Sequence, residues 1–412
     1  MNTEFKKNSF FAGGKAVYYA VALLVGGAVG IINPLVTAHM TVKNTGNVWI
    51  GIVSSSYFIF LSVGAVIINN KMKGRDVRNI IVAGLCIAAL CTFLFPFVHN
   101  TVVWLLLMCF TGIGISFNMV GIQAALHSSS PDDSRSAVSG MYSLLFASGF
   151  VISSVTGSLI YARLAWAAFA AGGIYLIAAV ALIRLGLKEV HTIPAGAGEK
   201  VFSKIFTALC GSFAYGFSET TLVSLYPLFL LKQGYSVDAM GYALGIFVIG
   251  CITGIVPVTR MSDRMGRSRC LFIIILASFA AIFGIVMLDN FILRMAFSFI
   301  AGFALGPVYP LSLAMSVQDL PHSEISSGTA MFTFSYGIGS AAGPFLSSLL
   351  MNALGNNHIF TLSFVLFAAF LVLMALTRGL KQGVRSAQEK EEDSEFSDFY
   401  INSPQGGIEN EK

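Results

Sequence analysis

The sequence predicts an all-α membrane protein with twelve transmembrane helices, arranged as two pseudo-symmetric six-helix bundles. Three observations lead to this prediction: an apolar composition, a series of long apolar segments, and an internal repeat. Hydrophobic residues make up 56% of the 412 positions and charged residues only 11%, whereas soluble domains carry about 25% charged residues. A chain of this composition is expected to lie in a lipid bilayer.

Twelve apolar segments follow one another along the chain, separated by short polar loops. Each is long enough to cross the hydrocarbon core, which takes about 20 residues. The first begins after Lys15 and is too long for the core of a signal peptide, so we expect it to stay in the mature protein. The segments are 16–40, 49–70, 79–98, 101–126, 137–161, 164–187, 203–231, 240–259, 270–288, 291–318, 325–351 and 358–377.

Positive residues in the loops indicate how the segments are oriented. Of the 25 Lys and Arg residues, 21 fall on the side of the two termini, Lys43, Arg163 and Lys232 fall on the other, and Arg294 lies just inside the tenth segment. Cytoplasmic loops of membrane proteins carry the excess of Lys and Arg. We therefore expect a multi-pass protein of the bacterial inner (plasma) membrane with both termini in the cytoplasm.

The two halves of the chain repeat each other. Segment 112–141 aligns without a gap with 302–331, at an offset of 190 residues. A near-constant offset across several helices predicts two related bundles, as in many transporters. Other matches are Gly51 with Gly241 and Gly149 with Gly339 at 190, and Asn33-Pro34-Leu35 with Tyr226-Pro227-Leu228 at 193.

This repeat divides the chain into five parts. The last part is rich in acidic residues and too polar to bury a core, so we expect it to be disordered. Because the positive charge of the rest gathers next to the membrane surface, we expect no nucleic-acid partner. The parts are a cytoplasmic N-terminal tail (1–15), the first bundle (16–187), a cytoplasmic linker (188–202), the second bundle (203–377) and an acidic cytoplasmic tail (378–412).

The loop between segments eight and nine contains Asp263, Gly266 and Arg267, followed by Arg269. This pattern resembles the signature loop of the major facilitator superfamily, Gly-x-x-x-Asp-x-x-Gly-Arg-Lys/Arg. Glycine permits the positive φ of a tight turn, and the charged residues can form charge-assisted contacts with helix ends. The resemblance implies the twelve-helix fold of that superfamily and a cytoplasmic gate at this loop.

Two further stretches bear on the same resemblance. In the loop between segments two and three, only Gly74 and Arg75 keep the signature pattern. The stretch from Tyr309 to Pro344 resembles the YcaD-like branch of the superfamily.

The fifth segment partly resembles a glycine-rich pattern that antiporters of the superfamily carry. Gly140, Gly149 and Gly157 keep the pattern, while serines replace its other small residues and its proline is absent. Small residues let transmembrane helices pack closely. The segment therefore indicates either packing alone or proton-coupled export.

One acidic residue, Glu219, lies deep inside an apolar segment. It is 14 residues in from Ile205, about 21 Å at 1.5 Å per residue and a little past the middle of the hydrocarbon core. A carboxylate at that depth is costly when it faces lipid, so we expect it to face the bundle interior or a water-filled cavity. Tyr215 and Tyr226 share its helical face. We interpret Glu219 as a proton or cationic-substrate site; the alternative is a structural carboxylate bonded to a neighbouring helix.

The family resemblance places segments one, four, seven and ten around a central cavity. Polar side chains on these segments could line it, although each could equally form a hydrogen bond between helices. Because no Lys or Arg lies at mid-membrane, the set suits a neutral, cationic or zwitterionic solute. Besides those of segment seven, these residues are Asn33, Asn118, Gln123, Tyr309, Ser312 and Ser316.

The chain lacks the Gly-x4-Gly-Lys-Ser/Thr loop of ATP-binding proteins. It shows no catalytic triad and no metal cage, so we expect neither an enzyme nor a bound cofactor. The predicted function is secondary transport of a small organic solute by alternating access, with a proton gradient as the energy source and a monomer as the working unit. Proton-coupled antiport, the efflux of a drug, metallophore or other amphiphilic metabolite, is favoured over import. A membrane sensor or assembly protein on the same scaffold is the alternative of another class.

Overall fold

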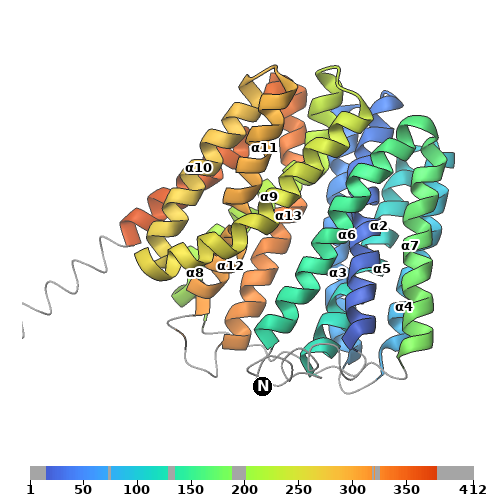
Figure 1. Ribbon diagram of the computed structural model, residues 1–412, viewed down its shortest axis with the longest axis horizontal. Helices are drawn as coiled ribbons and strands as arrows, with labels where there is room; N and C mark the ends of the chain where they lie inside the picture. The colour runs from blue at the N-terminus through green and yellow to red at the C-terminus, as the bar shows by residue number, and fades with distance from the viewer. Residues whose placement is uncertain are drawn as a thin grey trace, which may run out of the picture.

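The protein is a bundle of long helices, seen side-on in Figure 1. The structure, a computed structural model, describes residues 15–72, 76–128, 135–187, 201–317, 320 and 325–377. Within these ranges the regular secondary structure is helical. The helices of the two halves of the chain form two groups that lie side by side.

The first group consists of six long helices and one short 3-10 turn. Its members are α2 (Lys15–Val42), α3 (Asn47–Met72), α4 (Arg78–Leu94) continued by η1 (Phe95–Phe97), α5 (Thr101–Ser128), α6 (Arg135–Arg163) and α7 (Ala165–Gly186).

The second group repeats this order, with one span interrupted at Gly306 and Pro307. Its members are α8 (Phe202–Lys232), α9 (Val237–Met265), α10 (Arg267–Met287), α11 (Phe291–Leu305) with α12 (Val308–Val317), α13 (Ile325–Leu354), and η3 (Asn356–Phe360) leading into a helix over 361–377.

Ten segments of the described chain are long and apolar enough to cross a membrane, and α11 with α12 counts as one of them. The remaining two spans are α8 and α13, with 31 and 30 residues. Both carry many Ser, Thr and Gly residues, which lowers their hydropathy below that of the ten. The prediction of an all-α protein with twelve transmembrane helices is confirmed.

We call the end of the bundle where α2 begins the inner face and the end where α2 meets α3 the outer face. The names follow the orientation that the Lys and Arg residues predict.

Helix packing repeats at the 190-residue offset. A Cβ added at Gly26 of α2 would overlap the carbonyl oxygen of Phe146 on α6, and one added at Gly216 of α8 would overlap that of Tyr336 on α13. Gly216 and Tyr336 each lie 190 positions after Gly26 and Phe146. The helix backbones therefore meet at equivalent points in the two bundles. The turns after α2 and α8 agree, since Asn44 and Gly234 both have positive φ.

The match of Pro34 with Pro227 at an offset of 193 is therefore wrong as a spatial equivalence. Along α2 and α8 the close contacts stay at 190: Gly27 lies against Ser153, and Gly343 lies against the carbonyl of Phe217. The two prolines are the same residue type, but they do not occupy equivalent positions in the packing. The packing depends on where small residues let the helix backbones approach each other.

The two bundles meet most closely near the outer face. Gly51 on α3 lies against Ser348 and Pro344 on α13, and Gly241 on α9 lies against Ser158 and Ser154 on α6. These contacts are again related by 190 residues, so they form one reciprocal pair. We call them the outer seam. Toward the inner end of α6, in contrast, a Cβ at Gly140 would meet no atom within 4 Å. The two bundles are thus in direct backbone contact near the outer face.

Candidate functional site

Glu219 differs from every other acidic residue that the structure describes. The others, Asp76, Asp238, Asp263 and Asp289, lie in loops or within a few residues of a helix end. Glu219 lies within α8, far from both of its ends. At the 190-residue offset the first bundle carries Val29, a buried apolar residue of α2. The described part of the chain therefore holds one carboxyl at this level, and it belongs to the second bundle.

Two tyrosines lie beside this carboxyl group, and one of them binds it. The hydroxyl of Tyr336 on α13 donates a hydrogen bond to Glu219 Oε2 over 2.7 Å. Tyr215 lies one turn earlier on α8, with its ring centroid 6.0 Å from that of Tyr336. Glu219 and Tyr336 nevertheless keep part of their surface exposed. The hydrogen bond thus orients the carboxyl group of a residue that the protein does not fully enclose.

A third tyrosine, Tyr309 on α12, completes a ring of aromatic side chains beside Glu219. Its ring centroid lies 5.3 Å from that of Tyr336 and 5.9 Å from that of Tyr215, and the latter two are 6.0 Å apart. We call Glu219 with these three tyrosines the tyrosine cage. Three helices, α8, α12 and α13, contribute to it.

Small and hydroxyl residues bring α8 and α13 close enough to build the cage. One of the close approaches is at Gly216, which lies against the backbone of Tyr336. Hydroxyl groups then join the two backbones on either side of the cage. Ser212 donates to the Phe332 carbonyl at 2.8 Å, Ser335 to the Leu209 carbonyl at 2.8 Å, and Thr220 to the Ser340 carbonyl at 3.0 Å.

Of the nine predicted proton or substrate residues, the structure brings Glu219, Tyr215 and Tyr309 together. Tyr336 is not one of the nine, because the family resemblance places segments one, four, seven and ten around the cavity and leaves segment eleven out. A signal was available in the sequence, since both α8 and α13 carry a Tyr-Gly pair at Tyr215-Gly216 and Tyr336-Gly337.

The other six predicted residues form no hydrogen bond or ring contact with the tyrosine cage in the described part of the chain. Tyr226 is buried nearer the outer face, with its hydroxyl 2.8 Å from Ser298 Oγ. Gln123 is exposed on α5. Four are buried: Asn33; Asn118, whose amide has no partner among the described residues; Ser312, whose hydroxyl likewise has none there; and Ser316, which donates to the Leu313 carbonyl at 2.7 Å.

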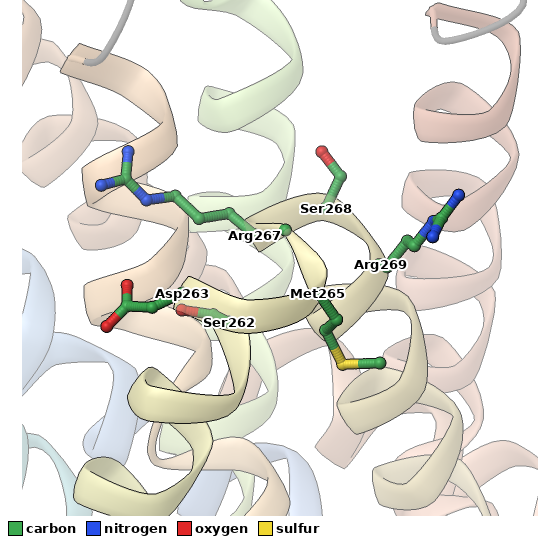
Figure 2. Close-up of a pocket in the computed structure, with 7 residues that line it drawn as sticks. Ser262, Asp263, Met265, Arg267, Ser268 and Arg269 are labelled. Carbon is green, nitrogen blue, oxygen red and sulfur yellow. The ribbon is translucent and has the colours of Figure 1, made fainter.

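The predicted gate loop forms a tight turn between α9 and α10 (Figure 2). Gly266 has φ +88°, the conformation that favours glycine. Arg267 donates to the Ala314 carbonyl of α12 at 3.3 Å, while Asp263 and Arg269 are exposed and point to opposite sides of the turn. Asp263 forms no ion pair with another described residue. Gly74 and Arg75 of the other loop lie outside the described residues.

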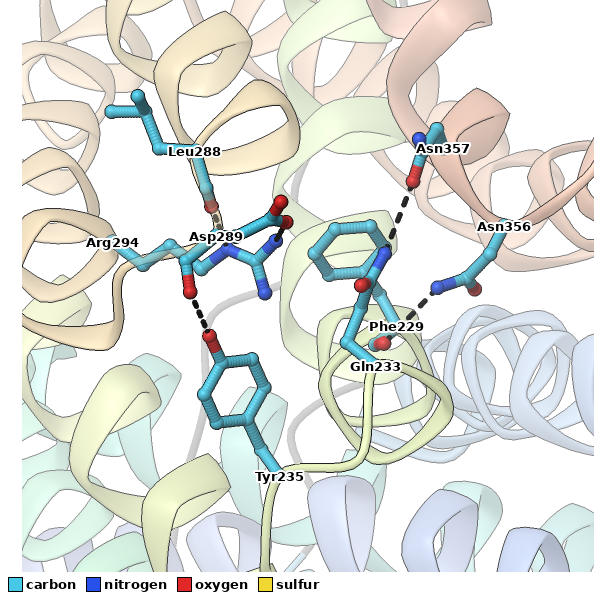
Figure 3. Close-up of polar contacts among 8 residues, drawn as sticks. All are labelled: Phe229, Gln233, Tyr235, Leu288, Asp289, Arg294, Asn356 and Asn357. Carbon is cyan, nitrogen blue, oxygen red and sulfur yellow. Dashed lines mark hydrogen bonds and ion pairs between the residues drawn. The ribbon is translucent and has the colours of Figure 1, made fainter.

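A polar cluster closes the outer end of the second bundle (Figure 3). Arg294 of α11 is fully buried, and its guanidinium group lies 5.2 Å from the ring centroids of both Phe229 and Tyr235. It donates to the Leu288 carbonyl and pairs with Asp289 at 3.2 Å. The residues 190 positions before Arg294 and Phe229 are Trp104 and His39, and their ring centroids lie 5.9 Å apart in the first bundle. The two bundles thus place a basic group against aromatic rings at equivalent points, with the roles of the helices exchanged.

No group of three or more His, Cys, Asp or Glu side chains that could hold a metal ion occurs among the described residues.

Comparison with known proteins decides the family. The profile of the Major Facilitator Superfamily matches residues 18–207 and 208–404. The chain belongs to the Major Facilitator Superfamily. Among its relatives is the "Uncharacterized MFS-type transporter YfkF" of Bacillus subtilis, 25% identical over 374 residues that cover 88% of this chain and 95% of the relative. Another is the transporter YcaD of Salmonella typhi, 26% identical over 371 residues, with 87% and 94% covered. The chain is thus a YcaD-like member of the superfamily.

Solved structures agree with this fold. The nucleoside transporter NupG superposes with a TM-score of 0.71 at 15% identity, over 89% of this chain and 98% of that chain. A bacterial homologue of the human lysosomal transporter Spinster, in an inward-facing and occupied conformation, gives 0.68 at 13% identity, over 89% and 95%. Family membership makes the protein a non-enzymatic secondary transporter that moves a small-molecule solute across the membrane by alternating access.

Proposed function

We propose that the protein is a proton-coupled exporter of a small organic solute and that Glu219 is the group that takes up and releases the proton. The observation that carries this proposal is the position of Glu219: an acidic residue in the middle of a transmembrane helix, partly exposed as a residue and oriented by Tyr336. Ionisable groups inside the membrane are costly and mark proton relays and substrate pathways. Two closely related bundles around such a group are the arrangement of an alternating-access carrier.

Export is supported by the small residues of α6. The serines of its glycine-rich pattern, Ser154 and Ser158, form half of the outer seam by packing against Gly241. A solute released to the outside has to pass this seam, and small side chains allow it to close tightly afterwards. The proposal takes the inner face as cytoplasmic, with both termini on that side and a monomer as the transport unit.

The test uses the full chain in proteoliposomes loaded with a pH-sensitive dye. An acidic lumen is imposed, and a panel of cationic, neutral and zwitterionic solutes is added outside. We expect at least one solute to accumulate while protons leave, and Glu219→Gln to slow both fluxes at least tenfold. Asp238→Asn, which changes an acidic residue at the start of α9, serves as the matched control and should transport like the wild type.

Three results would contradict the proposal. If no solute of the panel moves under any gradient, the protein is not a proton-coupled carrier of these classes, as expected for a sensor or assembly protein. If Glu219→Gln transports like the wild type with the same pH dependence, Glu219 is not the proton site. A solute that moves together with the proton would establish import in place of export.

A further inference from the structure

The turn between α9 and α10 carries positive charge that the described residues do not balance. Arg260, Arg264 and Arg269 are exposed, and none of them forms an ion pair with another described residue. We call these three residues the arginine turn. The acidic residue beside them, Asp263, is also exposed and leaves a net positive charge on this surface.

The positions of the three arginines on their helices favour a bound anion. Arg260 and Arg264 lie four residues apart on α9, a spacing at which like charges repel. Arg269 lies in the first turn of α10, which has no acidic residue, and the positive end of a helix disfavours a cation there. Arg269 also lines a hollow of about 410 Å³ at this turn (Figure 2). An anion bound here would offset both repulsions.

The same chain contains an acidic stretch, residues 389–398. Six of its ten residues are acidic, and Lys390 is its one basic residue, so its net charge is strongly negative. The acidic residues are Glu389, Glu391, Glu392, Asp393, Glu395 and Asp398.

The acidic stretch follows a helix that neighbours the arginine turn. The helix over 361–377 packs against α10, with the ring centroids of Phe364 and Phe279 5.1 Å apart. The two helices run in opposite directions, so the end of one and the start of the other both lie at the inner face. The twelve steps from Thr377 to Glu389 can span up to about 40 Å, whereas the axes of packed helices lie about 8–10 Å apart.

We propose that the arginine turn is a docking surface for the acidic stretch of the chain's own C-terminal tail. Anionic lipid headgroups carry the same charge and are the competing partner. The tail is favoured because its tether holds the acidic stretch at an effective concentration on the order of millimolar beside the arginines. The contact is electrostatic and therefore weakens as salt is added.

The experiment treats the purified full-length protein in a neutral detergent with a carbodiimide, which joins an amine directly to a carboxylate. Arg264→Lys keeps the positive charge and supplies the amine. We expect mass spectrometry to find crosslinks from position 264 to residues 389–398. Their yield should fall at least fivefold between about 0.1 M and about 1 M salt, since the screening length shortens from about 10 Å to about 3 Å. Adding Arg260→Gln and Arg269→Gln should lower the yield at least threefold.

A matched control places the same amine elsewhere on the inner face. Arg184 is exposed in the last turn of α7, in the first bundle, and Arg184→Lys should give a tail crosslink at least tenfold weaker. A second measurement needs no crosslinker: replacing the six acidic residues of 389–398 by Gln or Asn should speed up hydrogen–deuterium exchange over residues 260–269. Size-exclusion profiles identify any variant that fails to fold.

Equal crosslink yields at positions 184 and 264, or crosslinks confined to the tail's own Lys381, would overturn the proposal. So would unchanged exchange in the variant with the neutral tail. Nanodiscs separate the tail from lipid. The crosslink at position 264 should persist in both phosphatidylcholine and phosphatidylglycerol, and its loss in phosphatidylglycerol would assign the arginine turn to lipid headgroups instead. None of these measurements depends on transport, so the proposed function stands or fails separately.

Discussion

Two ionisable side chains inside the second bundle are accommodated in opposite ways. Arg294 is fully buried, and its charge is offset by the Leu288 carbonyl and by the faces of Phe229 and Tyr235 (Figure 3). Glu219 keeps part of its surface exposed and has only hydroxyl groups as partners. The arginine is held in one place and stabilises the fold, whereas the carboxyl is available to exchange its partner.

This difference predicts how the Arg294 cluster responds to mutation. The side chain of Asp289 is 94% exposed, and exposed ion pairs contribute about 0–1 kcal/mol. Asp289→Asn should therefore leave the unfolding midpoint nearly unchanged. Arg294→Leu removes the hydrogen bond to Leu288 and both ring contacts, and should lower stability by about 2–4 kcal/mol. Thermal unfolding of the two purified variants checks this, and equal effects would show that the ion pair itself is important.

At the residue scale, only part of the tyrosine cage could be predicted from the sequence. Glu219 and Tyr215 could be predicted because they share one helix, and spacing along a helix fixes which side chains share a face. Tyr336 could not, because its hydrogen bond to Glu219 depends on how closely α13 approaches α8 at Gly216. That distance depends on both helices together, so it produces no pattern in the sequence of either helix alone.

At the scale of the helix, α13 contains a backbone defect that its neighbour repairs. Pro344 has no N–H, so the Ser340 carbonyl one turn earlier has no partner within the helix. Thr220 Oγ1 of α8 lies 3.0 Å from that oxygen and donates to it, and it also lies 2.8 Å from its own Gly216 carbonyl. Inside a membrane, freed backbone groups have to be satisfied by neighbouring helices. The hydrogen bond from Thr220 to the carbonyl freed by Pro344 thus links α13 to α8 next to the tyrosine cage.

We predict that Thr220→Val destabilises the protein by about 1–3 kcal/mol, because the same-sized side chain leaves the buried Ser340 carbonyl without a donor. Adding Pro344→Ala restores the N–H and should recover most of this loss. A double-mutant cycle on the unfolding midpoints gives the coupling between the two sites. Additive effects would mean that Thr220 acts only through its own helix.

Helix existence and order were predictable, and the exact pairing of the halves was not. Apolar segments near the length needed to cross a bilayer identified all twelve spans. The interruption of the tenth span at Gly306 and Pro307, which divides it into α11 and α12, did not follow from hydropathy. The offset of 190 was visible from loops and glycines, but the chance match of Pro34 with Pro227 suggested 193 for one helix pair, and only the backbone contacts corrected it.

At the scale of the whole molecule, the outer seam is what holds the two bundles in their present arrangement. Gly51 faces Ser348 and Pro344, and Gly241 faces Ser158 and Ser154. Any larger side chain at either glycine meets a backbone oxygen, which cannot move without moving its helix. Interfaces of this kind favour one of two discrete arrangements.

Gly51→Ala should therefore loosen the outer face. Its Cβ would overlap the Ser348 hydroxyl and lie 2.7 Å from the Pro344 carbonyl oxygen. We expect faster hydrogen–deuterium exchange at the outer ends of α3 and α13 and a shift toward states open to the outside. Gly46→Ala is the matched control, because a Cβ there would meet no atom within 4 Å. Unchanged exchange in Gly51→Ala would mean that the seam is not a closed gate.

The first bundle has Val29 where the second has Glu219, and this asymmetry bears on the electrical behaviour of transport. With a single carboxyl at that level among the described residues, the proposed cycle carries one proton. A monovalent cation exported in exchange for that proton would cross without net charge movement, so the membrane voltage would do no work on it. Its gradient would be limited to about tenfold for each unit of pH difference, and clamping the voltage with potassium and valinomycin should leave the rate unchanged.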